Sequence, residues 1–346
     1  DQDVTDDNAK RDKLTLLFNS LNSTLVAQLR DAIKSQEVFL NSEHSFVQRS
    51  QFVEHFCLST LRERLVVSYL EFLSNSFDDI SQTVASRVPS AILLLLAKLC
   101  LTWANSGTLG HFLNIPEELL SKEHKPRFQC SNSSPFNLEP IQLPQPTAPA
   151  VLVKKFRDTS SQLLMAFVRL QGTNLAQLLR KSVEARDWLK NLEPRSVRSV
   201  VKRVLEDLTA MDRQISQLFP STGRNKDRAS DTRSSRSMVS NLRPSGSSSH
   251  FLEKTGRSAT SGGLPNAEMD PSLASQIRRL FTQRIDIFSP VESNRESLLL
   301  GVIKIGLKTL IECVRLQTFG KYGLQQIQVD CRYLQIHLWN FVSDEK

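Results

Sequence analysis

The chain has 346 residues, which is enough for about two domains of ordinary size. Apolar residues make up 40% of it, which excludes a chain that is disordered as a whole. The formal net charge of +8 suggests nucleic acid, but residues 221–257 hold eight Lys or Arg against three Asp or Glu, or +5 of that excess. Because this stretch is rich in serine and poor in apolar residues, we expect a linker there.

The five cysteines are odd in number and show no paired spacing, which favours a reducing compartment. Four of them are expected to be small buried apolar residues: Cys57, Cys100, Cys313 and Cys331. No signal peptide is visible, and the acidic start and abrupt end suggest a piece of a longer polypeptide. The longest apolar run, residues 91–104, is shorter than the ~20 residues of a membrane span and predicts a buried core helix.

Helical spacing of apolar residues dominates the first part of the chain. The expected helices are residues 10–40, 46–76, a short segment around Ile80 and Val84, 91–104 after Pro89, and 115–121. The apolar stripe of the first helix is Leu14, Phe18, Leu21, Leu25, Leu29 and Ile33. The stripe of the second is Phe52, Phe56, Leu61, Leu65, Tyr69 and Phe72.

Residues 126–150 contain six of the fourteen prolines and predict an extended connector. Helices are expected to resume over 151–193, and Pro194 is expected to start another helix. In that helix the apolar residues step by four and three over three heptads, which predicts a seam packed lengthwise against another helix. The seam residues are Val197, Val201, Val204, Leu208, Met211, Ile215 and Leu218.

The last block is expected to begin with a helix capped by Asp270, followed by a helix that starts at Ser289. Ser289 and Glu292 have the spacing of a capping box, in which each side chain accepts from the other residue's amide. This helix should run to Gly320. Gly320 and Gly323 should then allow a tight reversal through positive φ.

The final helix raises a question about its surface. Its apolar stripe is expected to be Leu324, Ile327, Cys331, Leu334, Leu338 and Phe341. Its flanks carry amides, where a solvent-facing helix usually carries Lys and Glu. We expect the side with Tyr322, Gln325, Gln326 and Asp330 to be available to a neighbouring helix, because amides are desolvated at lower cost than charges. The alternative is that Gln325, Gln326 and Gln328 simply face solvent and favour helix.

No residue pattern predicts an enzyme, a metal site or a cofactor site. The stretch 301–309, GVIKIGLKT, approaches a phosphate-binding loop, but Leu307 intrudes and no strand precedes it. Its two glycines are better interpreted as close-packing positions for a neighbouring helix. The six histidines show no metal-ligand spacing.

Two basic features leave alternatives open. Arg195, Arg198, Lys202 and Arg203 are expected in the first turns of their helix, either as a solvated face or as a contact for an acidic partner. The basic serine-rich stretch 233–237 is interpreted as a flexible tether, with a phosphorylation switch or an RNA contact as alternatives.

The sequence therefore predicts an all-α protein with disordered linkers. The expected divisions are a disordered start (1–9), a helical bundle (10–125), a proline-rich linker (126–150), the long helices of a second bundle (151–219), a disordered Ser/Arg-rich linker (220–269) and a truncated C-terminal helical bundle (270–346).

Residues 179–208 and 284–345 closely resemble the vacuolar protein sorting 51 (fat-free) family, and residues 88–101 resemble its middle region. The resemblance implies the small subunit of the Golgi-associated retrograde protein (GARP) and endosome-associated recycling protein (EARP) complexes. It also implies a CATCHR-like elongated rod of stacked antiparallel helical bundles. Its implied location is the cytosolic face of the trans-Golgi network and of recycling endosomes, with peripheral membrane association through the complex.

The resemblance implies partners that are proteins and no nucleic acid. They are the other large subunits of the tether and a syntaxin-type SNARE, which the family binds through an N-terminal segment that we do not find in this chain. The candidate partner-contact surface is Arg195, Arg198, Lys202, Arg203, Tyr322, Gln325, Gln326 and Asp330. The competing hypothesis is a helical scaffold of another pathway, whose basic linker contacts acidic membrane or RNA.

Overall fold

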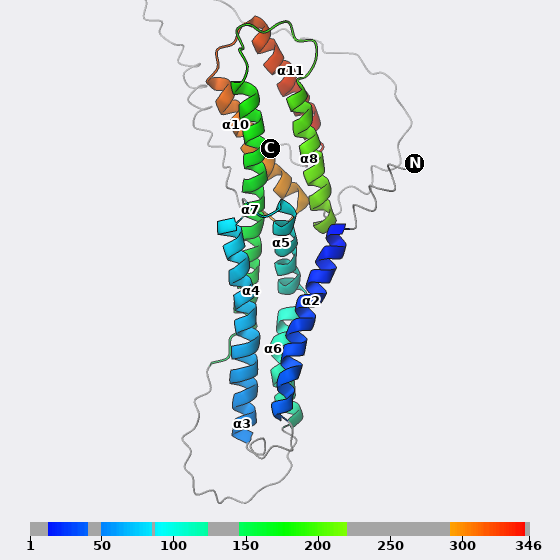
Figure 1. Cartoon of the computed structure of the whole chain (residues 1–346), viewed down its shortest axis with the longest axis vertical. Coiled ribbons are helices and arrows are strands. Elements are labelled where there is room, and N and C mark those ends of the chain that lie inside the picture. The colour runs from blue at the N-terminus through cyan, green and yellow to red at the C-terminus, as the bar shows by residue number, and fades with distance from the viewer. Residues whose placement is uncertain (1–12, 41–49, 85–86, 124–144, 220–290, 343–346) are drawn as a thin grey trace, which may run out of the picture. The chain divides into compact units, whose positions relative to one another are not determined.

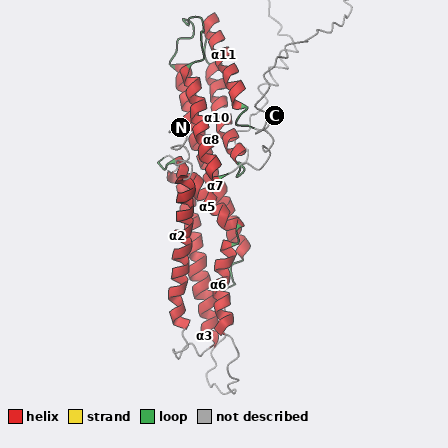
Figure 2. Ribbon diagram, turned by 90° about the vertical axis from the view of Figure 1, so that its right-hand side faces the viewer, coloured by secondary structure: helices red, strands yellow, loops and turns green. Residues whose placement is uncertain are grey.

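The computed structural model describes residues 13–40, 50–84, 87–123, 145–219 and 291–342. In these residues the chain is all-α, as predicted, and contains no strand (Figures 1 and 2). The α-helices are α2 (Lys13–Gln36), α3 (Ser50–His55), α4 (Ser68–Asp79), α5 (Ser90–Asn105), α6 (Thr108–Glu123), α7 (Pro149–Glu184), α8 (Ser199–Leu218), α10 (Arg295–Arg315) and α11 (Lys321–Leu338). A 3-10 turn (η1, Glu37–Leu40) and two π-helical stretches (η2, Phe56–Val67; η3, Ile80–Val84) complete them.

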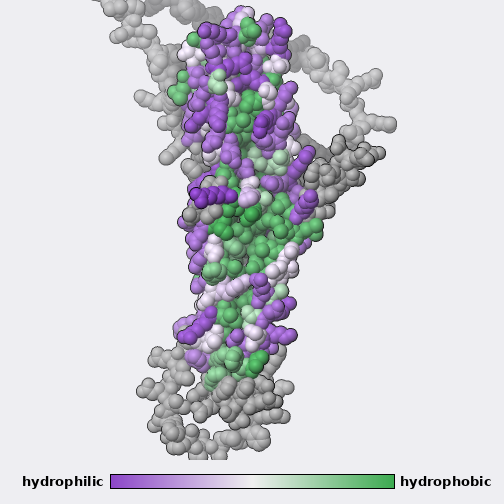
Figure 3. Space-filling model, viewed as in Figure 1, coloured by the Kyte–Doolittle hydropathy of each residue, from purple (hydrophilic) through white to green (hydrophobic). Residues whose placement is uncertain are grey.

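The predicted core helix over 91–104 is α5, and most of its side chains are buried. It packs along the first half of α7, where the Ser160 hydroxyl donates to the carbonyl of Ala97 over 3.0 Å. The rings of Trp103 and Phe156 lie 5.9 Å apart across the same interface. Lys98, which interrupts the apolar run, is half-buried, and burial lowers the pKa of its amine. The space-filling view shows apolar residues gathered on the surface over α5 and α2 (Figure 3).

The second half of α7 packs against α10 through glycines on both helices. A Cβ added at Gly301 would lie 2.8 Å from a methyl group of Val168, and one at Gly306 would lie 2.8 Å from Leu175. Gly172 of α7 faces Ile305 in the same way, at 2.5 Å. The prediction that the glycines of the stretch 301–309 allow close helix packing is thus confirmed.

The positions predicted as a heptad seam before residue 219 are buried from Val201 onward, as expected. The predicted packing along one other helix is wrong, because α8 contacts α2, α5, α7, α10 and α11. An ion pair fastens α8 to the start of α10: the Arg295 guanidinium donates to both carboxylate oxygens of Asp212, one of them at 2.7 Å. This hydrogen bonding raises the pKa of Arg295.

The helix expected over 46–76 is described from Ser50 as a succession of α3, η2 and α4. The short helix expected at Ile80 and Val84 is η3, which continues directly from α4 and is therefore not a separate helix. The apolar positions in the middle part of 46–76 recur every four or five residues, which suits the wider turn of a π-helix. Leu61 is fully buried, whereas Phe72 is 66% exposed. The change from π to α geometry turns Phe72 away from the core, which fixed 3.6-residue spacing cannot predict.

The capping box predicted at Ser289 and Glu292 is wrong. Ser289 lies outside the described residues, and Glu292 precedes the helix, which begins at Arg295. The N-cap is Asn294, whose side-chain oxygen accepts from the amide of Ser297 over 2.6 Å. The Ser297 hydroxyl accepts from the amide of Glu292, two residues before the N-cap, over 3.0 Å. The cap therefore forms five residues later than expected and is not a reciprocal capping box.

Three of the cysteines expected in the core, Cys57, Cys100 and Cys313, are buried, whereas Cys331 is exposed. Burial, reinforced by the charge of Asp78, raises the pKa of the Cys100 thiol to about 12.

The predicted division into two bundles and linkers stays a prediction. Residues 1–9, 220–269 and most of 126–150 lie outside the described residues, as does the predicted helix capped by Asp270. One continuous apolar cluster includes side chains from α2, α5, α7, α8, α10 and α11.

Candidate functional site: the junction of the α7–α8 loop with α11

The chain leaves α7 at Glu184 and enters α8 at Ser199, so the helix predicted to reach residue 193 ends early and Pro194 starts none. Between the two helices Trp188 is 2% exposed. Its ring nitrogen donates to the carbonyl of Val183 over 2.8 Å, and its ring centre lies 5.2 Å from that of Phe319. Burial of this large ring beneath the α10–α11 connection folds the loop back, which overrides the helical pattern.

Arg198 is the N-cap residue of α8 and is bound on three sides. Its backbone amide donates to Asp330 Oδ1 over 3.1 Å and its Nε donates to Asp330 Oδ2. One terminal nitrogen donates to the carbonyl of Ser182 over 3.0 Å, and the guanidinium carbon lies 4.9 Å from the Trp188 ring centre. The side chains of Arg198 and Asp330 are 10% and 3% exposed, so this is a buried ion pair that joins α7, α8 and α11.

Gln326 completes this junction. Its amide nitrogen donates to the carbonyl of Ser196 over 3.0 Å and to Asp330 Oδ1 over 3.1 Å, and the residue is 5% exposed. The expectation that Gln326 and Asp330 face outward is therefore wrong, and so is the placing of Leu324 and Cys331 in the core. The buried face of α11 is rotated, because Arg198 and Ser196 supply polar partners for side chains that local sequence assigns to the surface.

Gly320 and Gly323 act through close approach and not through positive φ. Gly320 has an extended backbone, with φ −77° and ψ 171°, and its amide donates to the carbonyl of Trp188 over 3.1 Å. A Cβ at Gly320 would lie 2.8 Å from the carbonyl oxygen of Leu189, and one at Gly323 would collide with that of Trp188. These glycines let the start of α11 lie directly against the α7–α8 loop.

The remaining predicted contact residues stay near the surface. Arg195, Lys202 and Arg203 are exposed, Tyr322 is 39% exposed and Gln325 is half-buried. Arg195 lies in the loop before α8 and lines an open cavity of about 900 Å³ beside Arg198 and Gln326. Of the four basic residues, only Lys202 and Arg203 lie within α8, as its fourth and fifth residues.

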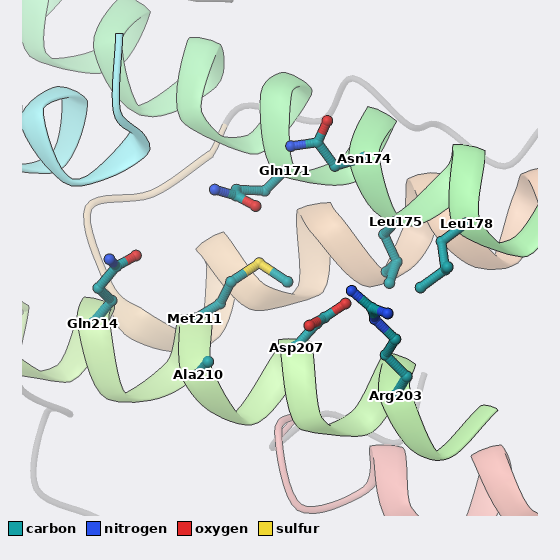
Figure 4. A pocket seen from close by; sticks show the side chains of 9 residues that line it. All are labelled: Gln171, Asn174, Leu175, Leu178, Arg203, Asp207, Ala210, Met211 and Gln214. Atoms are coloured by element: carbon teal, nitrogen blue, oxygen red, sulfur yellow. The ribbon is translucent and has the colours of Figure 1, made fainter. Parts of the chain in front are cut away.

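Arg203 lines a second cavity, of about 450 Å³, between α7 and α8 (Figure 4). Figure 4 shows Arg203 beside Asp207 on α8, with Leu175 and Leu178 opposite on α7. The rest of the lining consists of amide side chains and two apolar residues: Gln171, Asn174, Gln214, Ala210 and Met211. The cavity is a polar groove with an apolar floor and offers no convergent catalytic groups.

Within the described residues, no group of three or more His, Cys, Asp or Glu side chains is placed to hold a metal ion. In the same residues, no single helix is long and apolar enough to cross a membrane. By length and composition alone, Ser90–Asn105 and Thr108–Ser121 could do so together, with a bend of 52°.

Comparison with curated proteins finds relatives over nearly the whole chain. The chain is 39% identical over 336 residues to the vacuolar protein sorting-associated protein 51 homolog of Bos taurus, an alignment that covers 96% of the chain and 39% of that relative. It is 40% identical over 333 residues to the homolog of Danio rerio, covering 95% and 36%. The homolog of Arabidopsis thaliana is 28% identical over 272 residues, covering 79% and 32%.

No family profile matches the chain, and no solved structure matches it. The chain spans about two fifths of the length of the curated relatives that it matches. The similarity extends from vertebrates to Drosophila melanogaster, whose homolog is 36% identical over 329 residues. The chain belongs to the family of vacuolar protein sorting-associated protein 51 homologs.

Proposed function

We propose that the chain is a non-catalytic subunit of a vesicle-tethering complex of the GARP and EARP type. It would act in retrograde transport from endosomes to the trans-Golgi network and in endocytic recycling, at the cytosolic face of both membranes. The observation that carries the proposal is the identity of 39% to a vacuolar protein sorting-associated protein 51 homolog over 96% of the chain.

The fold supports this proposal because its described part is a set of long helices packed along their length, which suits a scaffold for protein contacts. The proposed partners are the other large subunits of the complex, which would assist SNARE-dependent fusion of the tethered vesicle. A direct contact with a syntaxin-type SNARE is proposed for the complex and not for the described residues.

We propose a partner-contact surface with fewer residues than the sequence predicted. Arg198, Gln326 and Asp330 bind one another inside the chain, so they position the loop before α8 and do not themselves face a partner. The exposed cations Lys202 and Arg203 remain candidates for contact with an acidic surface of another subunit.

The test is affinity purification of the tagged protein from cells, scored by mass spectrometry for the other large tether subunits. We expect their recovery in near-equal amounts, and the reciprocal recovery of this protein with a tagged partner. Replacing Lys202 by Glu should reduce recovery severalfold, because it reverses a cation at the proposed contact. The matched control is Lys154→Glu, which reverses an exposed lysine on α7, and should leave recovery unchanged. Recovery of ribonucleoproteins without tether subunits would refute the proposal and support a scaffold of another pathway.

A further inference from the structure

The face of α11 that points away from the core carries a second heptad pattern. Residues on this face step by three and four over the whole helix, in the spacing of the a and d positions of a coiled coil. The outer seam, as we call it, is Tyr322, Gln325, Val329, Arg332, Ile336 and Trp339. The core-facing residues of α11 lie on the opposite side and include Gly323, Ile327 and Leu334.

The apolar members of the outer seam are open to solvent in the described structure. Tyr322 is 39%, Val329 37%, Ile336 55% and Trp339 51% exposed. Tyr322, Val329 and Ile336 are seven residues apart, so they form one continuous row of large side chains along the helix. Two of these three, Val329 and Ile336, are β-branched, the class that coiled-coil dimers favour at a positions.

The chemistry beside the seam is cationic and amide-rich. The only carboxylate of α11, Asp330, is 2% exposed and paired with Arg198, so it presents no negative charge outward. Arg332 lies within the seam and donates to Gln335 over 3.0 Å, and Lys321 lies at its first turn. Gln328 and Gln335 occupy the positions that flank the row, where coiled coils usually carry charged residues.

A cavity of about 410 Å³ between α11 and α8 adjoins this face. Tyr333 and His337 line it from α11, with their ring centres 4.1 Å apart. Lys202 lines it from α8 and lies beside the carboxylate of Glu206. A helix seated on the outer seam would thus meet the cations of Lys321 and Arg332, with no exposed carboxylate of α11 to offset them.

We propose that the outer seam binds an amphipathic helix of another protein, whose flanking positions carry Glu or Asp. Charge selects this occupant over two others. A second copy of the chain would bring Lys321 and Arg332 against the same cations. The chain's own segment 270–288 carries three arginines against two aspartates and would also bring a net positive charge.

The inference rests on the proposed function in taking the occupant to be a protein helix. The experiment uses two synthetic helices of about four heptads, with Ile at a and Leu at d. One peptide carries Glu at its e and g positions and the other carries Lys. Binding of each labelled peptide to the protein is measured by fluorescence anisotropy, at peptide concentrations below its self-association. We expect the Glu peptide to bind at least about tenfold more tightly than the Lys peptide.

The variants that decide the question replace exposed residues, so they test the outer seam without disturbing the fold. Ile336→Lys should weaken binding of the Glu peptide at least about tenfold, because it removes a large apolar side chain from the row. The matched control is Leu324→Lys, which changes a 49% exposed residue of the same helix outside the seam and should leave binding unchanged. Arg332→Glu should shift the preference toward the Lys peptide. Circular dichroism should give the same helix content for all three variants.

Other outcomes would overturn the inference. Absence of Glu-peptide binding, or an equal loss in Leu324→Lys and Ile336→Lys, would show that the seam is not a docking surface. Binding that appears only after deletion of 270–288 would assign the seam to that segment. A dimer that dissociates in Ile336→Lys would assign it to a second copy. Recovery of the tether subunits without peptide binding refutes the seam alone, whereas peptide binding without their recovery refutes the proposed complex alone.

Discussion

Replacing Asp330 by alanine should destabilise the folded chain strongly, because the carboxylate is the counter-charge of a buried arginine. Asp330 accepts from the amide and Nε of Arg198 and from the side chain of Gln326, and its own side chain is 3% exposed. Removing one partner of a buried ion pair costs about 3–5 kcal/mol. Arg198 would keep its bond to Ser182 and its contact with Trp188, so we expect the lower end, about 3 kcal/mol.

The assay is urea denaturation followed by circular dichroism, applied as a double-mutant cycle. Asp330→Ala, Arg198→Leu and the double variant are compared with the wild type. The double variant should be more stable than the sum of the single losses indicates, with a coupling of about 1–3 kcal/mol. This follows because an apolar pair leaves no buried charge behind.

The control is the exposed pair Lys308–Glu312 of α10, whose charged atoms lie 3.8 Å apart. Its side chains are 40% and 56% exposed, so Glu312→Ala should cost no more than about 0.5 kcal/mol. If Asp330→Ala costs as little as Glu312→Ala, or if the two single losses simply add, Arg198 and Asp330 do not form the buried pair described.

Four further changes in stability and one difference in thiol reactivity follow from the surroundings of single residues. Gly323→Ala should lower the free energy of unfolding by more than about 1 kcal/mol, because the added Cβ would meet a backbone carbonyl. The control Gly110→Ala in α6 places its Cβ where nothing lies within 4 Å, and should raise that free energy by up to about 1 kcal/mol. Denaturation midpoints that shift in the same direction in both variants would contradict this. Asn294→Ala should lower the free energy of unfolding by about 1 kcal/mol, because α10 loses its N-cap. An unchanged denaturation midpoint would show that Asn294 does not cap the helix. Burial raises the pKa of the Asp78 carboxyl, so ionisation of this group opposes folding. Asp78→Asn should therefore stabilise the folded protein at neutral pH. This gain should vanish as the pH falls below 3.8, the ordinary aspartate pKa. In the native protein a maleimide should label Cys331 before the buried described thiols, and equal labelling rates would contradict its exposure.

Apolar periodicity predicted those parts of the fold in which the buried face of a helix is continuous and apolar. The buried face of α8 is such a case, because a regular step of three and four residues leaves little choice of buried face. The glycines of α10 are another, since Gly301 and Gly306 both face side chains of α7 where a Cβ would not fit. In both cases the signal lies within one helix.

Apolar periodicity predicted the wrong buried residues where a contact with a residue distant in sequence decides which side chains are buried. Asp330 and Gln326 are polar, so periodicity placed them outside, yet Arg198 lies 132 residues earlier than Asp330 and holds it in the interior. The end of α7 was missed for a related reason. Trp188 fits a helical stripe, but its ring fits better beneath Phe319, a contact that helical spacing alone does not reveal.

The amides of α11 thus divide by what they contact. Gln326 is an interior residue whose side-chain nitrogen donates to the carbonyl of Ser196 and to Asp330. A Lys or Glu at this position would add a charge beside the buried Arg198–Asp330 ion pair, whereas the amide adds none. Gln328 is exposed and makes no such contact in the described structure, so the same residue type there needs a different reason. A flanking amide can be covered by a partner helix at lower cost than a charge, which is the reason the outer seam supplies. Gln326→Glu should therefore destabilise the isolated chain, because it places a second carboxylate beside Asp330. Gln328→Glu should leave the unfolding of the chain unchanged and should weaken only its binding to the Glu peptide. Equal unfolding midpoints for the two variants, measured by urea denaturation, would remove the distinction between an interior and a flanking amide.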